Sequence, residues 1–88
     1  MSAVNEWLAL MRVHEGGVAI RDGEYLNQGQ PVADYLAAAL DELIRTEHLA
    51  LGRATPSGHQ QVCVTRAGQA RYAELNSNGV GSARHGGP

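Results

Sequence analysis

The sequence predicts a small α+β domain in which three helices alternate with two β-hairpins. Two segments carry apolar residues at helical spacing, and two further segments carry short strand-like runs on either side of a turn signal. The chain has 88 residues, which leaves room for one folded domain only. Its 43% hydrophobic and 18% charged residues are typical of a globular protein and exclude a disordered one.

The first helix is expected to begin at about Val4. Val4, Trp7, Leu8 and Met11 recur at i, i+3, i+4 and i+7, which predicts one apolar helical face. The glycine pair at 16–17 supplies a stop, because glycine readily takes the left-handed conformation that ends helices. We interpret the apolar stripe either as a core face or as a seam between two copies of the chain, since a domain this small has a thin core.

A β-hairpin is expected next, over residues 18–21 and 24–27. Asp22 and Gly23 form its two-residue turn, where both central residues need a positive φ. The implied register places Arg21 opposite Glu24 and residue 20 opposite residue 25. The alternative is an irregular loop with a single turn.

The second helix is the clearest element, with Pro31 in its first turn and an end near Glu47. Its core stripe consists of Val32, Leu36, Ala39, Leu40, Leu43 and Ile44. The opposite face is acidic, with Asp34 and Asp41 against a single cation, Arg45.

A second hairpin follows over residues 49–54 and 59–64, joined by a four-residue turn at 55–58. Its register pairs Leu49 with Val64 and Leu51 with Val62 at the base, and Arg53 with Gln60 and Ala54 with His59 near the tip. Apolar pairs at the base and polar pairs at the tip predict a flap that projects into solvent.

The last helix is expected to begin after Thr65, whose hydroxyl suits an N-cap. Residues 76–88 contain four glycines and almost no apolar side chain, which predicts a flexible C-terminal tail. The domain is therefore expected to span residues 1–75.

Charge divides the chain into two unequal parts. Residues 1–47 hold three arginines and eight carboxylates, a net charge of −5. Residues 48–73 hold three arginines and no carboxylate, a net charge of +3. An anionic partner such as a nucleic acid is expected to meet the second part.

Several function classes are excluded by what the sequence lacks. The four histidines and Cys63 show no metal-ligand spacing, and no phosphate loop, dinucleotide fingerprint or metalloprotease motif is present. We therefore expect no catalytic site, no metal and no cofactor. A single cysteine, no membrane-spanning apolar run and no signal peptide indicate a cytoplasmic protein.

Two segments carry a family resemblance: LAAALDELIRTEHLAL at 36–51 and VTRAGQARYAEL at 64–75. They resemble winged helix-turn-helix DNA-binding domains of the MarR and PadR kind. The matching positions are Leu40, Leu43, Leu49, Val64, Thr65, Gly68, Tyr72 and Leu75. The resemblance implies a winged-helix domain whose wing is the second hairpin, with an extra N-terminal hairpin at 18–27. It further implies a small transcription regulator that binds DNA and dimerises.

The candidate DNA-contact residues lie mainly on the second hairpin and the segments beside it. The hairpin tip supplies donors suited to phosphates or a minor groove, the amides before the second helix suit bases or phosphates, and the last helix extends the basic strip. These residues are Arg53, Thr55, Ser57, His59, Gln60, Gln28, Gln30, Arg45, Arg66 and Arg71. The alternative for each group is ordinary surface polarity.

Two functions remain open from the sequence. The first is binding of double-stranded DNA by the wing, as a transcription regulator or accessory factor, with a homodimer through the first helix as a candidate assembly. The second is a protein-interaction module on the same scaffold, with a partner on the acidic face of the second helix. The basic wing favours the first function and the acidic first half favours the second.

Overall fold

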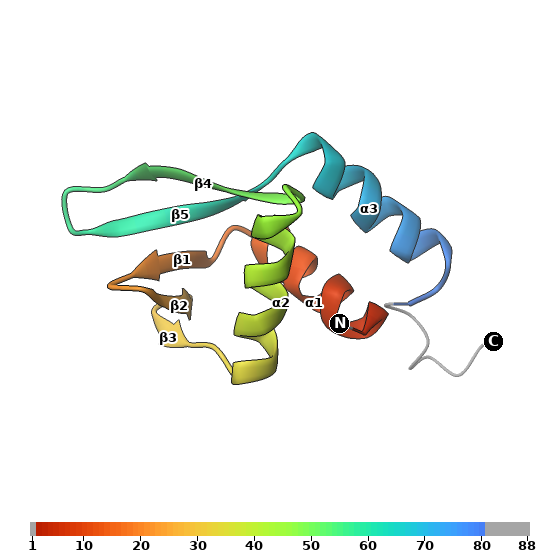
Figure 1. The fold of residues 1–88 in the computed structure, drawn as a ribbon, viewed down its shortest axis with the longest axis horizontal. Helices are drawn as coiled ribbons and strands as arrows, with labels where there is room; N and C mark the ends of the chain where they lie inside the picture. Colours follow the sequence, from red (N-terminus) through yellow and green to blue (C-terminus); the bar gives the residue numbers. More distant parts are fainter. Residues whose placement is uncertain (1, 81–88) are drawn as a thin grey trace.

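The computed structural model describes residues 2–80, and all structural statements below refer to this part of the chain. Its elements are α1 (Ala3–His14), β1 (Val18–Arg21), β2 (Glu24–Asn27), β3 (Gln30–Pro31), α2 (Asp34–Arg45), β4 (Leu49–Ala54), β5 (His59–Val64) and α3 (Arg66–Ser77) (Figure 1). They form a small α+β domain with three helices and a five-stranded antiparallel sheet, which confirms the predicted class.

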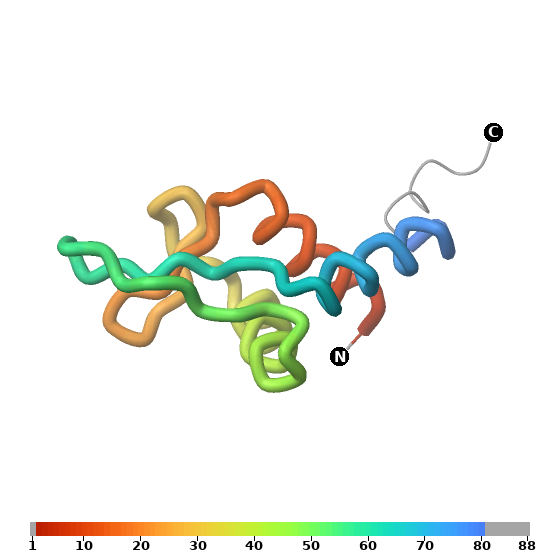
Figure 2. Tube along the Cα trace, turned by 90° about the horizontal axis from the view of Figure 1, so that it is seen from above, coloured from red at the N-terminus to blue at the C-terminus, as the bar shows by residue number. Residues whose placement is uncertain are grey.

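The sheet joins the two hairpins into one surface, in the strand order β3-β2-β1-β5-β4. The joint is the pairing of β1 with β5, in which Ala19 lies opposite Gln61 and Arg21 opposite His59. The β4–β5 hairpin extends beyond the helices at one end of the molecule, α3 lies at the other end, and α1 and α2 lie between them (Figures 1 and 2). We call the β4–β5 hairpin with its turn the wing.

The register of the first hairpin and of the wing base is as predicted. Arg21 pairs with Glu24 and Ile20 with Tyr25. In the wing, Leu49 pairs with Val64 and Leu51 with Val62.

Near the wing tip the predicted register is wrong. Ala54 lies opposite Gln60, not opposite His59, and Arg53 therefore does not face Gln60. The cause is a register shift between Leu51 and Ala54, which places one extra residue on β4, as in a β-bulge. The Gln60 side chain supports this geometry because its Nε2 donates to the Gly52 carbonyl at 3.0 Å.

The start of the second helix also differs from the prediction. Pro31 lies in β3, opposite Leu26, and α2 begins only at Asp34. A two-residue edge strand tolerates proline because its outer side needs no N–H for the ladder. The helix ends at Arg45, and Glu47 takes φ 67°, so the chain turns directly into β4.

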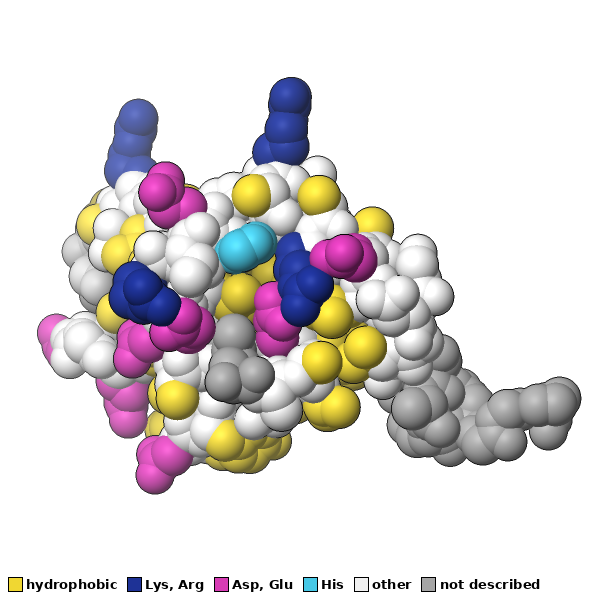
Figure 3. Space-filling model, turned by 45° about the vertical axis from the view of Figure 1, so that its right-hand side comes forward, with side chains coloured by type: hydrophobic (Ala, Val, Ile, Leu, Met, Phe, Trp, Pro, Cys, Tyr) yellow, Lys and Arg dark blue, Asp and Glu magenta, His cyan; other side chains and the backbone are white. Residues whose placement is uncertain are grey.

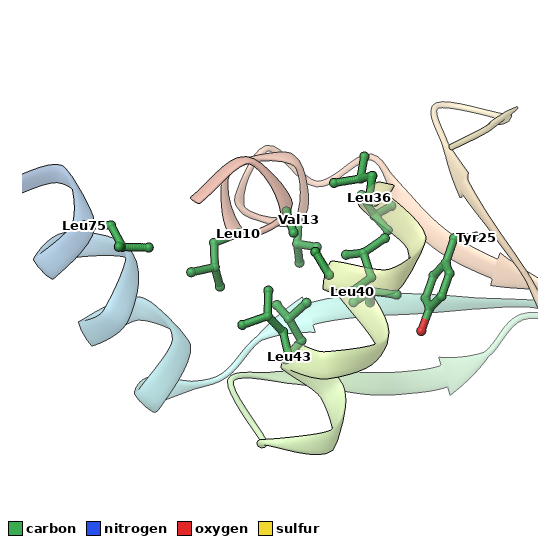
Figure 4. Packing of buried hydrophobic residues seen from close by; sticks show 12 residues of the cluster. Leu10, Val13, Tyr25, Leu36, Leu40, Leu43 and Leu75 are labelled. Atoms are coloured by element: carbon green, nitrogen blue, oxygen red, sulfur yellow. The ribbon is translucent and has the colours of Figure 1, made fainter. Parts of the chain in front are cut away.

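Helices and sheet share one apolar core (Figure 4). Four members of the predicted α2 stripe, Leu36, Ala39, Leu40 and Leu43, are buried. Ile44 and Val32 are partly buried against this core, and Val32 lies before the start of the helix. The core also contains leucine and valine side chains of α1, Val18, Tyr25, Leu49 and Val62 of the sheet, and Leu75 of α3.

The predicted face of α1 is wrong. The buried residues are Ala9, Leu10 and Val13, whereas Val4 is 57% exposed. Trp7 and Leu8 are partly buried against the core. The helix carries apolar residues on more than one side, so the spacing alone could not identify the core face.

The last helix begins as predicted, with Thr65 as its N-cap. Thr65 Oγ1 accepts from the Gly68 N–H at 3.0 Å and donates to the Glu47 carbonyl at 2.7 Å. The helix continues to Ser77, and Val80 packs against the core, so the expected domain boundary after residue 75 falls within the folded part. Residues 81–88 of the expected tail lie outside the described residues.

Candidate nucleic-acid interface

The wing tip brings three of the candidate residues into one hydrogen-bonded chain. Thr55 Oγ1 lies 2.9 Å from Ser57 Oγ, which lies 3.0 Å from Nδ1 of His59. The His59 backbone N–H donates back to Thr55 Oγ1 at 3.2 Å. We call Thr55, Ser57 and His59 the tip network. These contacts connect residues two and four positions apart, so they hold the turn in one conformation.

The other two wing candidates have different surroundings. Arg53 lies within the irregular stretch of β4, between Leu51 and Ala54, and is exposed. Gln60 is half-buried, and its side-chain amide donates to the Gly52 carbonyl within the wing. This hydrogen bond gives Gln60 a structural role. The neighbouring Gln61 is exposed, but its Nε2 donates to the Gly16 carbonyl at 3.2 Å.

The predicted amide pair before the second helix lies far from the wing. Gln28 occupies the β2–β3 turn with φ 53°, its N–H bonded to the Gly17 carbonyl at 2.8 Å, and Gln30 begins β3. Because β3 and β4 are opposite edges of the five-stranded sheet, about 19 Å separates them at the usual strand spacing. The structure therefore does not bring these amides together with the wing tip.

Most arginines in residues 2–80 lie beside a carboxylate. Arg45 is paired with Glu42 on the same helix. The remaining pairs are Arg12 with Glu15 at 3.7 Å, Arg21 with Asp22 at 4.0 Å, and Arg71 with Glu6 at 2.7 Å and Glu74 at 2.6 Å. Figure 3 shows one face on which basic and acidic side chains lie next to one another.

Arg71, a predicted DNA contact, is the most strongly engaged of these residues. Its Nε and one terminal nitrogen donate to the two carboxylate oxygens of Glu6, at 2.7 and 2.8 Å. These hydrogen bonds lower the pKa of Glu6 and, together with the bond to Glu74, raise the pKa of Arg71. A guanidinium held by two carboxylates is poorly placed to bind a phosphate.

Two arginines are left without a carboxylate within salt-bridge distance among residues 2–80: Arg53 on the wing and Arg66 at the start of α3. Both are exposed. They lie in the segment 48–73, which contains no carboxylate. The free positive charge of the described chain is thus concentrated on the wing and at its base.

The outer side of α2 offers no comparable cation. Asp34 lies in the first turn, and Asp41 accepts from the Tyr25 hydroxyl at 2.5 Å. Burial of Tyr25, and then its bond to Asp41, raise the pKa of the Tyr25 hydroxyl above its ordinary value. The hydrogen bond between Tyr25 and Asp41 joins β2 to α2. The one arginine of α2, Arg45, is paired with Glu42.

One basic residue near the tip was missed from the sequence. Arg21 ends β1 directly opposite His59 of the wing, so the sheet brings it to the same end as the tip network. Its partner Asp22 lies at the limit of salt-bridge distance and is 93% exposed. Only the pairing of β1 with β5 reveals this neighbour, and neither hairpin signals that pairing locally.

The remaining sequence predictions concern sites and assembly outside the wing. Cys63 is an exposed free thiol opposite Ala50, and residues 2–80 contain no cluster of three metal-ligating side chains. No helix in the same range could span a bilayer. Dimerisation through α1 stays a prediction. Val4, one of the apolar residues predicted for the face of α1, remains exposed.

Comparison of the chain with protein-family models, with curated proteins and with solved structures finds no match.

Proposed function

We propose that this protein binds double-stranded DNA through its wing, with phosphate oxygens as the main contacts. The observation that carries the proposal is the location of the two arginines without carboxylate partners among residues 2–80, Arg53 and Arg66. Guanidinium groups bind phosphate oxygens with strong charge-assisted hydrogen bonds.

The wing has a suitable shape for such contacts. It is the edge hairpin of the five-stranded sheet, with β5 also paired to β1, and it extends beyond the helices (Figure 2). Arg53 lies toward its tip and Arg66 just after its base, about 15 Å apart for a strand of this length. Hydroxyl and imidazole groups of the tip network add hydrogen-bond donors beside Arg53.

The charge on α2 argues against its insertion into a DNA groove. Its outer side carries Asp34 without an arginine partner among residues 2–80, and its one arginine is neutralised by Glu42. A carboxylate brought against the phosphate backbone is repelled. Contact through the wing, with little reading of base sequence, therefore fits this chain better than a recognition helix in the major groove.

The winged-helix architecture is part of the same proposal. Its support is the order of α2 followed at once by a long hairpin, together with the pairing of β1 against the second strand of that hairpin. In this arrangement β2 and β3 occupy the place of the helix that winged-helix domains carry before the recognition helix. A regulator or accessory factor with wing contacts is the corresponding role.

A salt titration of binding to random-sequence duplex DNA tests the proposal. Contacts to two or three phosphates predict a log–log slope of about −2 to −3, from roughly −0.9 per phosphate. Arg53→Ala or Arg66→Ala is expected to weaken binding to all sequences and to flatten the slope by nearly one unit. Arg45→Ala is the matched control, and it should leave the slope unchanged.

Two results would overturn DNA binding by the wing: no duplex binding by the wild-type protein at low salt, or binding that is insensitive to Arg53 and Arg66. The protein-interaction function would then be the better candidate. Its starting point would be the side of α2 where Tyr35 is 53% exposed.

A further inference from the structure

The hydrogens of the tip network can be arranged in two directions, and one of them leaves His59 with an N–H at Nε2. We infer that Ser57 is a positioning residue that holds the His59 ring by Nδ1, so that the ring presents an N–H at Nε2 to a phosphate oxygen. The inference rests on the proposed DNA binding by the wing and adds the donor atom and the residue that orients it.

In the first direction, Thr55 Oγ1 accepts from the His59 backbone N–H and donates its own hydrogen to Ser57 Oγ at 2.9 Å. The Ser57 hydrogen then points to Nδ1 of His59 at 3.0 Å. A neutral imidazole whose Nδ1 accepts carries its proton on Nε2.

The reverse direction keeps the same contacts within the turn but is poorer for the ligand. If Nδ1 donated to Ser57 and Ser57 to Thr55, Thr55 Oγ1 would accept twice, and its own hydrogen would be left to solvent because Thr55 is exposed. Nε2 of the neutral ring would then be an acceptor, which cannot bind a phosphate oxygen. Phosphate binding therefore selects the first direction.

Protonation of the ring does not remove the donor. A charged imidazole donates from both nitrogens, so Nδ1–H would turn to Ser57 Oγ and the serine hydrogen to Thr55. Nε2 has no hydrogen-bond partner among residues 2–80 and keeps its N–H in this state as well. Ser57 restrains the ring in both states, which lowers the conformational entropy that phosphate binding must remove.

The first experiment reads the tautomer in the free protein. Long-range ¹H–¹⁵N NMR spectra at about pH 8.5, where an ordinary imidazole is neutral, are expected to show the Nε2–H form for His59, assigned by its loss in His59→Gln. Ser57→Ala should shift the ring nitrogens toward a mixture of tautomers. Ser57→Thr retains a hydroxyl and should restore the wild-type pattern.

The second experiment is a double-mutant cycle on duplex DNA affinity. Ser57→Ala is expected to weaken binding about two- to ten-fold, the range of one hydrogen bond. If Ser57 acts through the ring, Ser57→Ala should cost nothing further in a His59→Ala background. Losses that multiply would mean that Ser57 contacts DNA independently, which would overturn its positioning role.

The two experiments separate this inference from the proposed function. A wild-type Nδ1–H tautomer, or a tautomer unchanged by Ser57→Ala, overturns the inference whether or not the protein binds DNA. Conversely, an Nε2–H tautomer that depends on Ser57, in a protein that binds no duplex at low salt, would leave the orientation of the ring established and refute DNA binding.

Discussion

The contact between Glu6 and Arg71 joins residues 65 positions apart and connects α1 to α3. The Glu6 side chain is 12% exposed and that of Arg71 34%. Beside this pair, Trp7 Nε1 donates to Asn76 Oδ1 at 2.8 Å. These two contacts tie α3 to the rest of the domain, and the ion pair is the one with a measurable pH dependence.

The sign of this dependence follows from the lowered pKa of Glu6, which the hydrogen bond from Arg71 causes first of all. Because the folded pKa lies below the ordinary value of 4.5, the pair stabilises the fold above pH 4.5. This stabilisation is lost as the pH falls through the folded pKa.

Glu6→Gln is expected to lower the free energy of unfolding at neutral pH by about 1–2 kcal/mol, a value reduced by the partial exposure of Arg71. The variant should also lose less stability than the wild type on acidification below pH 4.5. Thermal melts over an acid pH series measure both effects. Glu15→Gln, which removes the exposed partner of Arg12, is the control and should change little; identical acid profiles for wild type and Glu6→Gln would contradict the assignment.

At the scale of elements, the junction between the wing and α3 depends on Gly68. A Cβ at this position would lie 1.9 Å from the His48 carbonyl oxygen and 2.9 Å from Val64 Cγ1. The first of these neighbours is backbone, which cannot move aside without shifting the start of β4. The same close approach lets Thr65 reach the Glu47 carbonyl.

Gly68→Ala is therefore expected to lower the free energy of unfolding by about 1–2 kcal/mol. The helix-propensity gain of roughly 1 kcal/mol for alanine does not offset an overlap with backbone, which costs typically 1–3 kcal/mol and occasionally more. Denaturant unfolding gives the value, and Gln69→Ala, at the exposed next position, should stay within about ±0.5 kcal/mol. A Gly68→Ala variant as stable as the wild type would mean that α3 is not packed this closely on β4.

Elements set by local chemistry could be predicted from the sequence. The Asp22-Gly23 turn determined the register of the first hairpin, since both residues take a positive φ, 52° and 79°. The Thr65 cap and the α2 stripe likewise depend on residues within one or two helical turns.

Elements set by distant contacts could not be predicted. The buried side of α1 carries a charged residue, Glu6, and only its pairing with Arg71 makes that side acceptable for packing. The sequence pattern places Pro31 in a helix because the pairing of β3 with β2 has no local signal. The register shift in β4 became visible only with the partner strand in place.

For the whole molecule, the sequence predicted which part is basic but not which arginines are free. Seven arginines are spread along the chain, and contacts between α1 and α3 decide that Arg71 is neutralised. The β1–β5 pairing brings Arg21 to the wing end together with its partner Asp22 and the cross-strand Glu24. The two arginines left unpaired within residues 2–80, Arg53 and Arg66, lie on the wing and just after its base, whereas α2 begins next to β3 at the other edge of the sheet.

This separation predicts where DNA perturbs the molecule. Backbone amide shifts on addition of a short duplex at low salt should change at residues 52–61 and at Arg66, and stay constant over the first turn of α2, because only the end of this helix leads into β4. Asp34→Asn should alter the affinity less than two-fold, because α2 begins at the far edge of the sheet and charges beyond a Debye length of about 10 Å at 0.1 M salt are screened. Shift changes centred on α2, together with a large gain of affinity in Asp34→Asn, would instead place that helix against the phosphates and make the wing a secondary contact.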